Sequence, residues 1–425
     1  MRRRNFEHIG EVLYEETLPN GLRLCVVPKK GFRSSYALFA ADYGGAHRRF
    51  ALDGALIDTP AGVAHYLEHK MFDLPGGDNA LDILTANGAD PNASTGADMT
   101  SYFFQCTEHF EENLRMLLHF VSTPYFTDET VEKERGIITQ EILMGEDDPG
   151  LGLYYRLLGM LYASHPLRER VAGTEESIRA ITAETLYACH RAFYAPGNMV
   201  LCVEGDVDPE RILAIAREAL PQETQPVPEA DFGPAESLLP VESYSRETMP
   251  VSAPQFLLGA KFAPAAKGEE ALRQRLTASL ALRTLFGRSS PFYTQLYAKG
   301  LLNLDFDYEA DFITNAAMLI LGGESRDPDA VLAEVKKEIE ALEKNGLDEE
   351  RFRRAKRASL GARLRGLEDF ESVCFALASG LIEGYCALEG PELLERIDKA
   401  DCERFLLDVL RPERLAFAIY EPKKD

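Results

Sequence analysis

Two histidines and a glutamate stand close together in the chain, in the order His-x-x-Glu-His: His65, Glu68 and His69. On a helix, residues four apart share a face, so both imidazoles can reach one ion. Two neutral ring nitrogens, a third protein ligand and an open position for water suit a catalytic zinc ion. Zinc lowers the pKa of a bound water, and Glu68 flanks the same face as a carboxylate that can take the proton. By helical periodicity Phe72 shares this face, which we expect to line a cleft.

A third ligand should be another acid or histidine, and Glu141 is the best candidate. On one helix, Glu134 and Glu141 differ in direction by only about 20°. Both border the apolar stripe Val131, Ile138 and Ile142, which should face the core. Two carboxylates beside a core are costly without partners, and a cation gives them one.

The alternative is that these groups bind no metal. Histidines at i and i+4 can be ordinary surface residues, and most helical glutamates are solvated. All eight histidines fall within the first 190 residues. Any histidine-based chemistry therefore belongs to the first half of the chain.

A proline-rich segment divides the chain near its middle. Residues 221–250 hold six prolines with Glu and Gln between them, which cannot sustain a helix or a central strand. A chain of 425 residues also exceeds the usual size of one hydrophobic core. We therefore predict an N-terminal zinc-binding catalytic domain at 1–220, a linker at 221–250 and a C-terminal domain without a metal site at 251–425.

The two sides of the linker show a similar order of elements. Before it, hydrophobic periodicity predicts a strand at 36–41, a helix at 62–72, a strand at 101–106, a helix at 109–121 and a long helix from 127. After it, the same order is predicted at 255–262, 269–285, 316–321, 329–342 and from 347. Both long helices begin with acidic residues, as the helix dipole prefers. The predicted fold class is α+β, with two tandem domains of similar structure.

Composition limits the partners and the compartment. A net charge of −23 argues against nucleic acid, because phosphates are bound by surplus Lys and Arg. No stretch approaches about 18 consecutive apolar residues, so no membrane span is expected. The basic start, Met1 to Arg4, leads into a polar and acidic stretch, unlike a secretory leader. Seven scattered cysteines without a CxxC pair are typical of a reduced, cytoplasmic protein.

The motif and its surroundings resemble the pitrilysin/insulinase and mitochondrial-processing-peptidase family, peptidase family M16, whose inverted zinc motif is H-x-x-E-H. In that family a second glutamate follows in a helix reading approximately E-x-x-x-x-x-x-E-[IV]. Glu134, Glu141 and Ile142 match it, with Glu141 72 residues beyond His69. Other similar segments are 18–22, 62–64, 92–95 with 100–102, 165–166 and 194–199. The resemblance covers nearly the whole chain and is strongest to a bacterial, half-length, cytoplasmic branch.

The resemblance implies a zinc-dependent metalloendopeptidase that hydrolyses peptides or small unfolded proteins. It implies Zn²⁺ ligands at His65, His69 and Glu141, a general base at Glu68, and a supporting catalytic acid at Glu134. Each half of the chain is expected to be an α+β unit of a hollow shell.

The resemblance also implies a substrate-binding edge strand at Asn92, Ala93, Ser94 and Thr95. A peptide would join this edge as an extra strand, so that backbone hydrogen bonds give affinity with little sequence preference. The alternative for Asn92 and Ser94 is ordinary turn chemistry.

The second half departs from the family pattern. Family members carry an Arg and, about six or seven residues later, a Tyr that hold the substrate and stabilise the oxyanion. Here Tyr297 stands where the Arg belongs, and Asn303 or Leu304 where the Tyr belongs; Tyr297 or Arg288 could substitute, but neither fits the pattern. We therefore expect a dimer. Two forms are open: a heterodimer with a related subunit that supplies the Arg and Tyr, and a homodimer.

Two other functions are open. The chain could be a non-catalytic or weakly active subunit of a heterodimeric assembly of this family, although such a scaffold needs no aligned ligand set. It could instead be a small-molecule metalloenzyme that shares the inverted motif, but such chains are much shorter and lack a duplicated second half.

Overall fold

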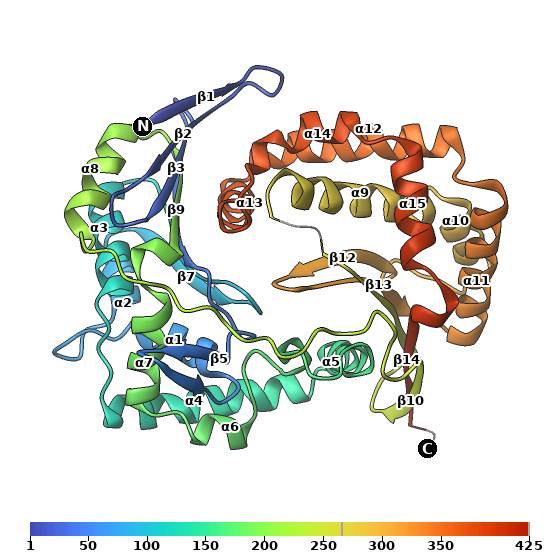
Figure 1. The fold of residues 1–425 in the computed structure, drawn as a ribbon, viewed down its shortest axis with the longest axis horizontal. Coiled ribbons are helices and arrows are strands. Elements are labelled where there is room, and N and C mark those ends of the chain that lie inside the picture. The colour runs from blue at the N-terminus through green and yellow to red at the C-terminus, as the bar shows by residue number, and fades with distance from the viewer. Residues whose placement is uncertain (265–266, 424–425) are drawn as a thin grey trace. The chain divides into compact units, whose positions relative to one another are not determined.

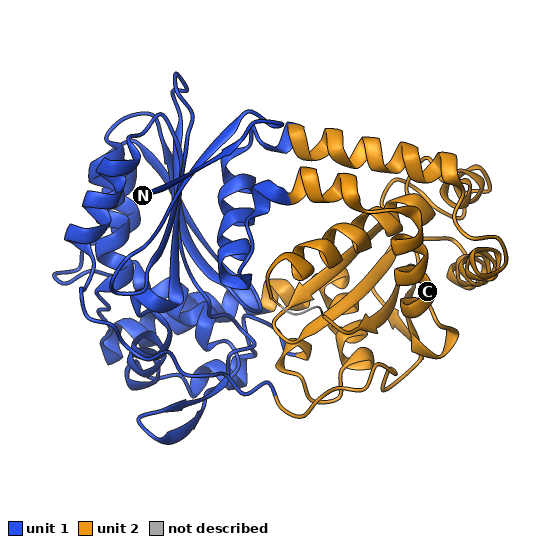
Figure 2. Ribbon diagram, turned by 45° about the horizontal axis from the view of Figure 1, so that its top comes forward, with its two compact units in different colours: residues 1–142, 169–232, 365–389 blue, residues 143–168, 233–364, 390–425 orange. Residues whose placement is uncertain are grey.

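The computed structural model describes residues 1–264 and 267–423 (Figure 1). The contacts divide it into two compact units (Figure 2). Unit 1 holds Met1–Ile142, Glu169–Phe232 and Arg365–Glu389, and unit 2 holds Leu143–Arg168, Gly233–Leu364 and the chain from Gly390 onward. Each unit thus takes segments from both sides of the proline-rich segment. The domain boundaries drawn from the sequence stay a prediction.

Unit 1 is built on a seven-stranded sheet with the strand order β1-β2-β3-β9-β4-β8-β7. The strands are β1 (Arg2–Phe6), β2 (Glu11–Thr17), β3 (Arg23–Pro28), β4 (Ser35–Ala41), β7 (Ala89–Thr95), β8 (Thr100–Cys106) and β9 (Met199–Gly205). A separate hairpin joins β5 (Arg49–Leu52) to β6 (Ala55–Asp58). Every residue of β4 and β9 is buried, as expected for central strands covered on both faces. β7 is an end strand, paired on one side only, with β8.

Both faces of this sheet carry helices. One face packs its main core against α1 (Val63–Met71), α2 (Ala80–Ala86), α3 (Phe110–Ser122), α4 (Asp128–Glu146), α7 (Ala183–Phe193) and α8 (Pro209–Ala219). The short helix α6 (Glu175–Arg179) also belongs to unit 1. On the other face lies α13 (Phe370–Glu383), from the far side of the linker. Alternate residues of β4 serve the two cores: Ala37 and Phe39 face the first, and Tyr36 and Leu38 face the second.

Unit 2 repeats the plan with a five-stranded sheet in the order β10-β14-β11-β13-β12. Its strands are β10 (Tyr244–Met249), β11 (Gln255–Phe262), β12 (Asp307–Ile313), β13 (Ala316–Glu324) and β14 (Leu415–Pro422). Its helices are α5 (Pro149–Leu161), α9 (Glu269–Phe286), α10 (Pro291–Ala298), α11 (Pro328–Asn345), α12 (Glu349–Gly366), α14 (Gly390–Arg396) and α15 (Lys399–Val409). The predicted α+β class and the order of elements on each side of the linker are confirmed.

The proline-rich segment is held in place by specific contacts. In unit 2 the Glu236 carboxylate accepts backbone N–H bonds from Ala163, Ser164 and His165 at 3.1, 2.7 and 3.0 Å. Burial opposes ionisation of Glu236, but these hydrogen bonds outweigh it and lower its pKa to about 2. The segment ends in β10, an edge strand, where flanking prolines are tolerated.

No single helix in the described ranges is both long and apolar enough to cross a bilayer. One bent pair of helices, Phe370–Glu383 with Ala387–Arg396, has the length and composition of a membrane span, by these two properties only.

Candidate metal centre

The motif helix α1 lies inside unit 1 and is covered on nearly all sides. It begins after Gly62, whose backbone is left-handed (φ 93°) and where a Cβ would lie 2.6 Å from the Ala172 carbonyl oxygen. Only glycine fits there. Of the nine residues of α1, all but His69 are buried. The prediction that Phe72 lies on a cleft-facing side is therefore wrong: its ring centroid lies 5.2 Å from that of Phe120 in the core.

The long helix α4 is fixed against α1 by polar contacts along its first half. The Tyr66 hydroxyl donates to the Val131 carbonyl, and the buried Lys70 ammonium donates to the Thr130 carbonyl at 3.1 Å. Val131, Ile138 and Ile142 are the buried residues of α4, which confirms the predicted core stripe. Sequence reasoning missed Tyr66 and Lys70 as anchors, because motif spacing gives no sign of a contact to another helix.

Glu141 and the two histidines converge at the junction of these helices. The Nε2 atom of His65 lies 3.3 Å from one carboxylate oxygen of Glu141, and Nε2 of His69 lies 3.5 Å from the other. Among the residues that the structure describes, this is the one group of three whose donor atoms could hold a metal ion, all within 4.8 Å of one another. His65 is buried, and Glu141 is about half exposed, with a side-chain exposure of 49%.

The donor atoms and their spacing fit zinc. Zinc binds imidazole nitrogen and carboxylate oxygen at about 2.0–2.2 Å in a tetrahedron, which puts neighbouring ligand atoms about 3.3–3.6 Å apart. The two nitrogen–oxygen distances in this group, 3.3 and 3.5 Å, lie in that range. Two imidazoles and one carboxylate also match the ligand count of a catalytic zinc site with an open position.

Glu134 contacts the other side of His69. Its carboxylate lies 3.0 Å from Nδ1 of His69, which leaves Nε2 of that ring directed at Glu141. Burial alone would lower the pKa of His69, but the hydrogen bond from His69 to Glu134 and the charge of Glu68 outweigh it and raise the pKa. For Glu134, burial is outweighed by the bond to His69, and its pKa is lowered. A carboxylate on the outer nitrogen of a ligand histidine fixes its tautomer and orientation.

The Glu141 carboxylate is also held ionised. Its hydrogen bond with His65 is the main cause of a lowered pKa, against a smaller opposing effect of burial. The Nδ1 atom of His65, in contrast, is buried without a hydrogen-bond partner among the described residues. An imidazole with one unpartnered buried nitrogen stabilises the fold poorly, so the ring is better explained by what its Nε2 atom faces.

Glu68 contacts the end of strand β7. The Glu68 side chain is buried, and the Thr95 hydroxyl donates to its Oε2 atom at 2.5 Å. Alternation along β7 sends Ala93 and Thr95 to the side of α1, where Ala93 packs against the main core. Asn92 and Ser94 point to the opposite face, where the Ser94 hydroxyl lies 2.9 Å from that of Ser101.

In unit 2, the residues at the positions where the sequence departs from the family's Arg and Tyr pattern form local contacts. Tyr297 is half exposed and stacks on Tyr293, with ring centroids 5.7 Å apart. Asn303 donates to Asp305 at 3.0 Å, and Arg288 donates to the carbonyl of Leu304 at 3.1 Å. None of these residues contributes to the group of candidate ligands.

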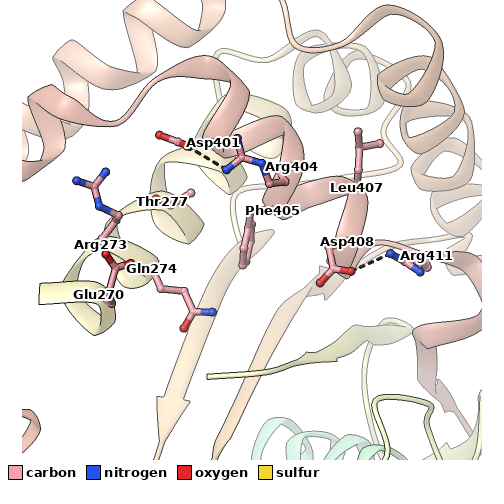
Figure 3. A pocket seen from close by; sticks show the side chains of 10 residues that line it. All are labelled: Glu270, Arg273, Gln274, Thr277, Asp401, Arg404, Phe405, Leu407, Asp408 and Arg411. Atoms are coloured by element: carbon pink, nitrogen blue, oxygen red, sulfur yellow. Dashed lines mark hydrogen bonds and ion pairs between the residues drawn. The ribbon is translucent and has the colours of Figure 1, made fainter. Parts of the chain in front are cut away.

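Unit 2 also has a groove of about 660 Å³ between α9 and α15 (Figure 3). Arg404 and Arg411 line it, but each pairs with an aspartate three residues earlier in the chain, Asp401 and Asp408 respectively. Opposite charges are therefore largely neutralised within the groove, which gives no clear preference for a charged ligand.

Comparison with known proteins gives matches over most of the chain. A family model described as insulinase (peptidase family M16) matches residues 53–175, and one described as the peptidase M16 inactive domain matches 180–359. The chain is 35% identical to an uncharacterized zinc protease, YmfH of Bacillus subtilis, over 98% of both sequences.

Solved structures match over similar lengths. An M16-like peptidase of Alicyclobacillus acidocaldarius has a TM-score of 0.93 and 31% identity, over 97% of this chain and 99% of that one. A peptidase M16 inactive domain from Pseudomonas fluorescens has a TM-score of 0.80 over 97% and 98% of the two chains, and at 16% identity it shows the fold alone.

Proposed function

Because the chain belongs to the insulinase family, peptidase family M16, we propose that it is a zinc-dependent metalloendopeptidase that cleaves peptides or small unfolded proteins. Relatives that match it are named zinc proteases. The observation that supports the proposal most strongly is the convergence of His65, His69 and Glu141, with their donor atoms within 4.8 Å. Glu68 extends from the same helix as the two histidines.

The residues divide the work of hydrolysis among them. When bound by His65, His69 and Glu141, zinc would supply a Lewis acid that acidifies a water and polarises the scissile carbonyl. Glu68 would accept the proton of the attacking water and return it to the leaving amine. Glu134 would keep the His69 ring in the tautomer and orientation that ligation requires.

Strand β7 is proposed to hold the substrate. No strand of the described ranges pairs with its outer edge, so an extended peptide can add to it by backbone hydrogen bonds beside α1. Such binding selects an extended backbone more than particular side chains, which agrees with peptides or unfolded segments as substrates. We further propose a dimer acting in the cytoplasm, the compartment that seven buried, unpaired cysteines favour.

One set of measurements tests the proposed activity. Metal analysis of the purified protein should give about one zinc per chain, and a fluorogenic peptide should be hydrolysed and protected by a chelator. Glu68→Gln should keep the zinc and lose at least about 10²-fold in rate, since it removes the base but not a ligand. Zinc binding without any peptide cleavage would count against a peptidase, and a wild-type rate for Glu68→Gln would reject the assigned base.

A second function is favoured by the residues in unit 2. Tyr297, Asn303 and Leu304 stand where the family carries its Arg and Tyr, and loss of an oxyanion donor typically costs about 3–4 kcal/mol. The chain would then be a weakly active or non-catalytic subunit of a heterodimeric assembly, whose partner supplies the missing groups.

That alternative is tested by mixing. The chain is purified alone and with candidate related subunits, and each preparation is assayed on the same peptide. Activity that rises at least about 10²-fold on mixing supports the heterodimer. Full activity of the isolated chain rejects it.

A further inference from the structure

The general base proposed above has one hydrogen-bond partner among the described residues, and it is a hydroxyl. The Thr95 Oγ1 atom donates to Oε2 of Glu68 at 2.5 Å. Thr95 is the last residue of β7 and is only partly exposed, and Glu68 is 8% exposed. The other oxygen of Glu68, Oε1, has no such partner in the described structure.

The Thr95 hydroxyl is itself held by a rigid frame. Thr95 lies directly opposite Thr100 in the β7–β8 ladder, and the Thr100 hydroxyl lies 3.5 Å from that of Thr95. The buried Thr100 hydroxyl also donates to the carbonyl of Tyr43 at 2.9 Å. A threonine side chain has only one rotatable carbon–carbon bond. In Thr95 the contact with the Thr100 hydroxyl and the β-strand backbone restrict that bond further.

The turn after Thr95 is fixed as well. The N–H groups of Gly45 and Ala46 donate to the carbonyls of Gly96 and Ala97 at 3.0 and 2.8 Å. Gly44 approaches so closely that a Cβ there would lie 2.6 Å from the backbone of Ala97. The end of β7 is therefore tied to the segment after β4, and Thr95 cannot move independently of the sheet.

A glutamate base needs such support, because its carboxylate rotates about three side-chain bonds. Ordering a long side chain costs about 1.5–2 kcal/mol of conformational free energy. A misplacement of about 1 Å can cost about 10²-fold in rate. A hydroxyl that occupies one carboxylate oxygen fixes the rotamer and leaves the other oxygen free for proton transfer.

We infer that Thr95 is a positioning residue, whose hydroxyl holds Oε2 of Glu68 so that Oε1 faces the attacking water. The inference rests on the proposed function and changes the role that the family resemblance implied for Thr95, which was substrate binding. Thr95 acts on the base through its side chain, while the unpaired backbone edge of β7 remains available to the peptide.

A pair of substitutions separates the hydroxyl from the shape of the side chain. Thr95→Val keeps the shape and removes the hydroxyl, and it should lower kcat by about 10- to 100-fold with KM nearly unchanged. Thr95→Ser keeps the hydroxyl and should recover most of that loss. Thr85→Val, on the exposed side of α2, is the matched control for a lost threonine hydroxyl. A higher KM at unchanged kcat would assign Thr95 to substrate binding, and equal losses in Thr95→Val and Thr95→Ser would exclude the hydroxyl; either result overturns the inference.

A second measurement does not depend on activity. The unfolding temperatures of the zinc-loaded wild type, Thr95→Val, Glu68→Ala and the double variant form a thermodynamic cycle. If the hydroxyl holds Glu68, the two substitutions are non-additive, and the double variant is close to Glu68→Ala. Additive shifts overturn the inference even if the enzyme is active. Non-additive shifts in a protein that cleaves no peptide support the contact and reject only the proposed function.

Discussion

The motif helix α1 of unit 1 and helix α9 of unit 2 show how two similar units differ in what they bury. In α9 of unit 2 the buried residues are apolar apart from Thr277 and Thr284, and Thr284 donates to a carbonyl of its own helix. In α1 of unit 1, His65, Glu68 and Lys70 are buried together. Polar groups in a core cost stability unless they are paired. The α9 core is explained by folding alone, and so is Lys70 of α1, which pairs with Thr130 and Asp73. His65, whose buried Nδ1 atom has no partner among the described residues, needs another reason, and a metal centre provides one.

The largest effect should come from the ligand that α4 contributes. Glu141→Ala removes one of three zinc ligands, and we expect zinc to be lost and hydrolysis to fall by at least about 10³-fold. Glu132→Ala, on the same helix but exposed and paired with Arg135, makes the same change of charge and should keep both. Metal analysis and the peptide assay measure this. Retained zinc in Glu141→Ala would show that Glu141 is not a ligand, so the proposed metal centre would no longer explain how the α1 core differs from the α9 core.

The next effect tests the apolar core of unit 2. Leu280 on α9 is fully buried, so Leu280→Ala should destabilise the protein by about 2–5 kcal/mol. Zinc bound per folded chain should not change, because the candidate ligands found among the described residues all lie in unit 1. Denaturant unfolding followed by metal analysis of the folded fraction checks both expectations. Weaker zinc binding in this variant would mean that core packing in unit 2 affects the metal centre in unit 1.

A smaller effect is expected from the carboxylate behind His69. Glu134→Gln keeps the size of the side chain and can still accept a hydrogen bond, but it removes the charge. Zinc affinity should fall by about 10- to 100-fold, as for other carboxylates that contact a ligand histidine. Competition with a chelator of known affinity measures this change. An unaltered affinity would show that Glu134 does not support the ligand histidine.

The smallest effect concerns a buried acid of unit 1 outside the metal centre. Glu204 in β9 is fully buried, and its burial raises its pKa from 4.5 to about 8 although Lys29 lies 3.2 Å away. A carboxyl with a raised pKa binds its proton more tightly in the folded than in the unfolded state. Stability should therefore fall as the pH rises from about 4.5 to about 8.

The pH dependence is measured by thermal unfolding. The unfolding temperature should drop by roughly a few degrees across that range. Glu204→Gln cannot titrate and should flatten the curve. The opposite slope, or the same slope in Glu204→Gln, would show that another group dominates.

Much of the fold could be predicted from the sequence because its signals are local. Strand 255–262 and the core stripe of α4 follow from periodicity alone. The convergence of His65 and His69 with Glu141 followed from helical spacing together with the family pattern. What periodicity could not give is which surface an apolar face covers: nothing local in 370–383 indicates that α13 packs on the sheet of the other half.

The details of the site were beyond sequence reasoning for a related reason. The family pattern places Thr95 with Asn92, Ala93 and Ser94 in one substrate-binding edge strand, yet its side chain contacts Glu68, 27 residues earlier in the chain. The expected open face of α1 at Phe72 was wrong because the rings of Tyr102 and Phe120 and the main core lie against Phe72. A helical wheel of one segment does not contain these neighbours.

The position of α13 sets a limit on how the protein can be dissected. Its residues Phe370, Val373 and Leu377 cover a face of the unit 1 sheet to which Val27, Leu38 and Val200 contribute. A fragment that stops at the proline-rich segment carries every candidate ligand but leaves this apolar surface bare, a template for aggregation. A smaller scaffold that keeps the centre would therefore have to include residues 365–389, connected so that α13 still covers the sheet.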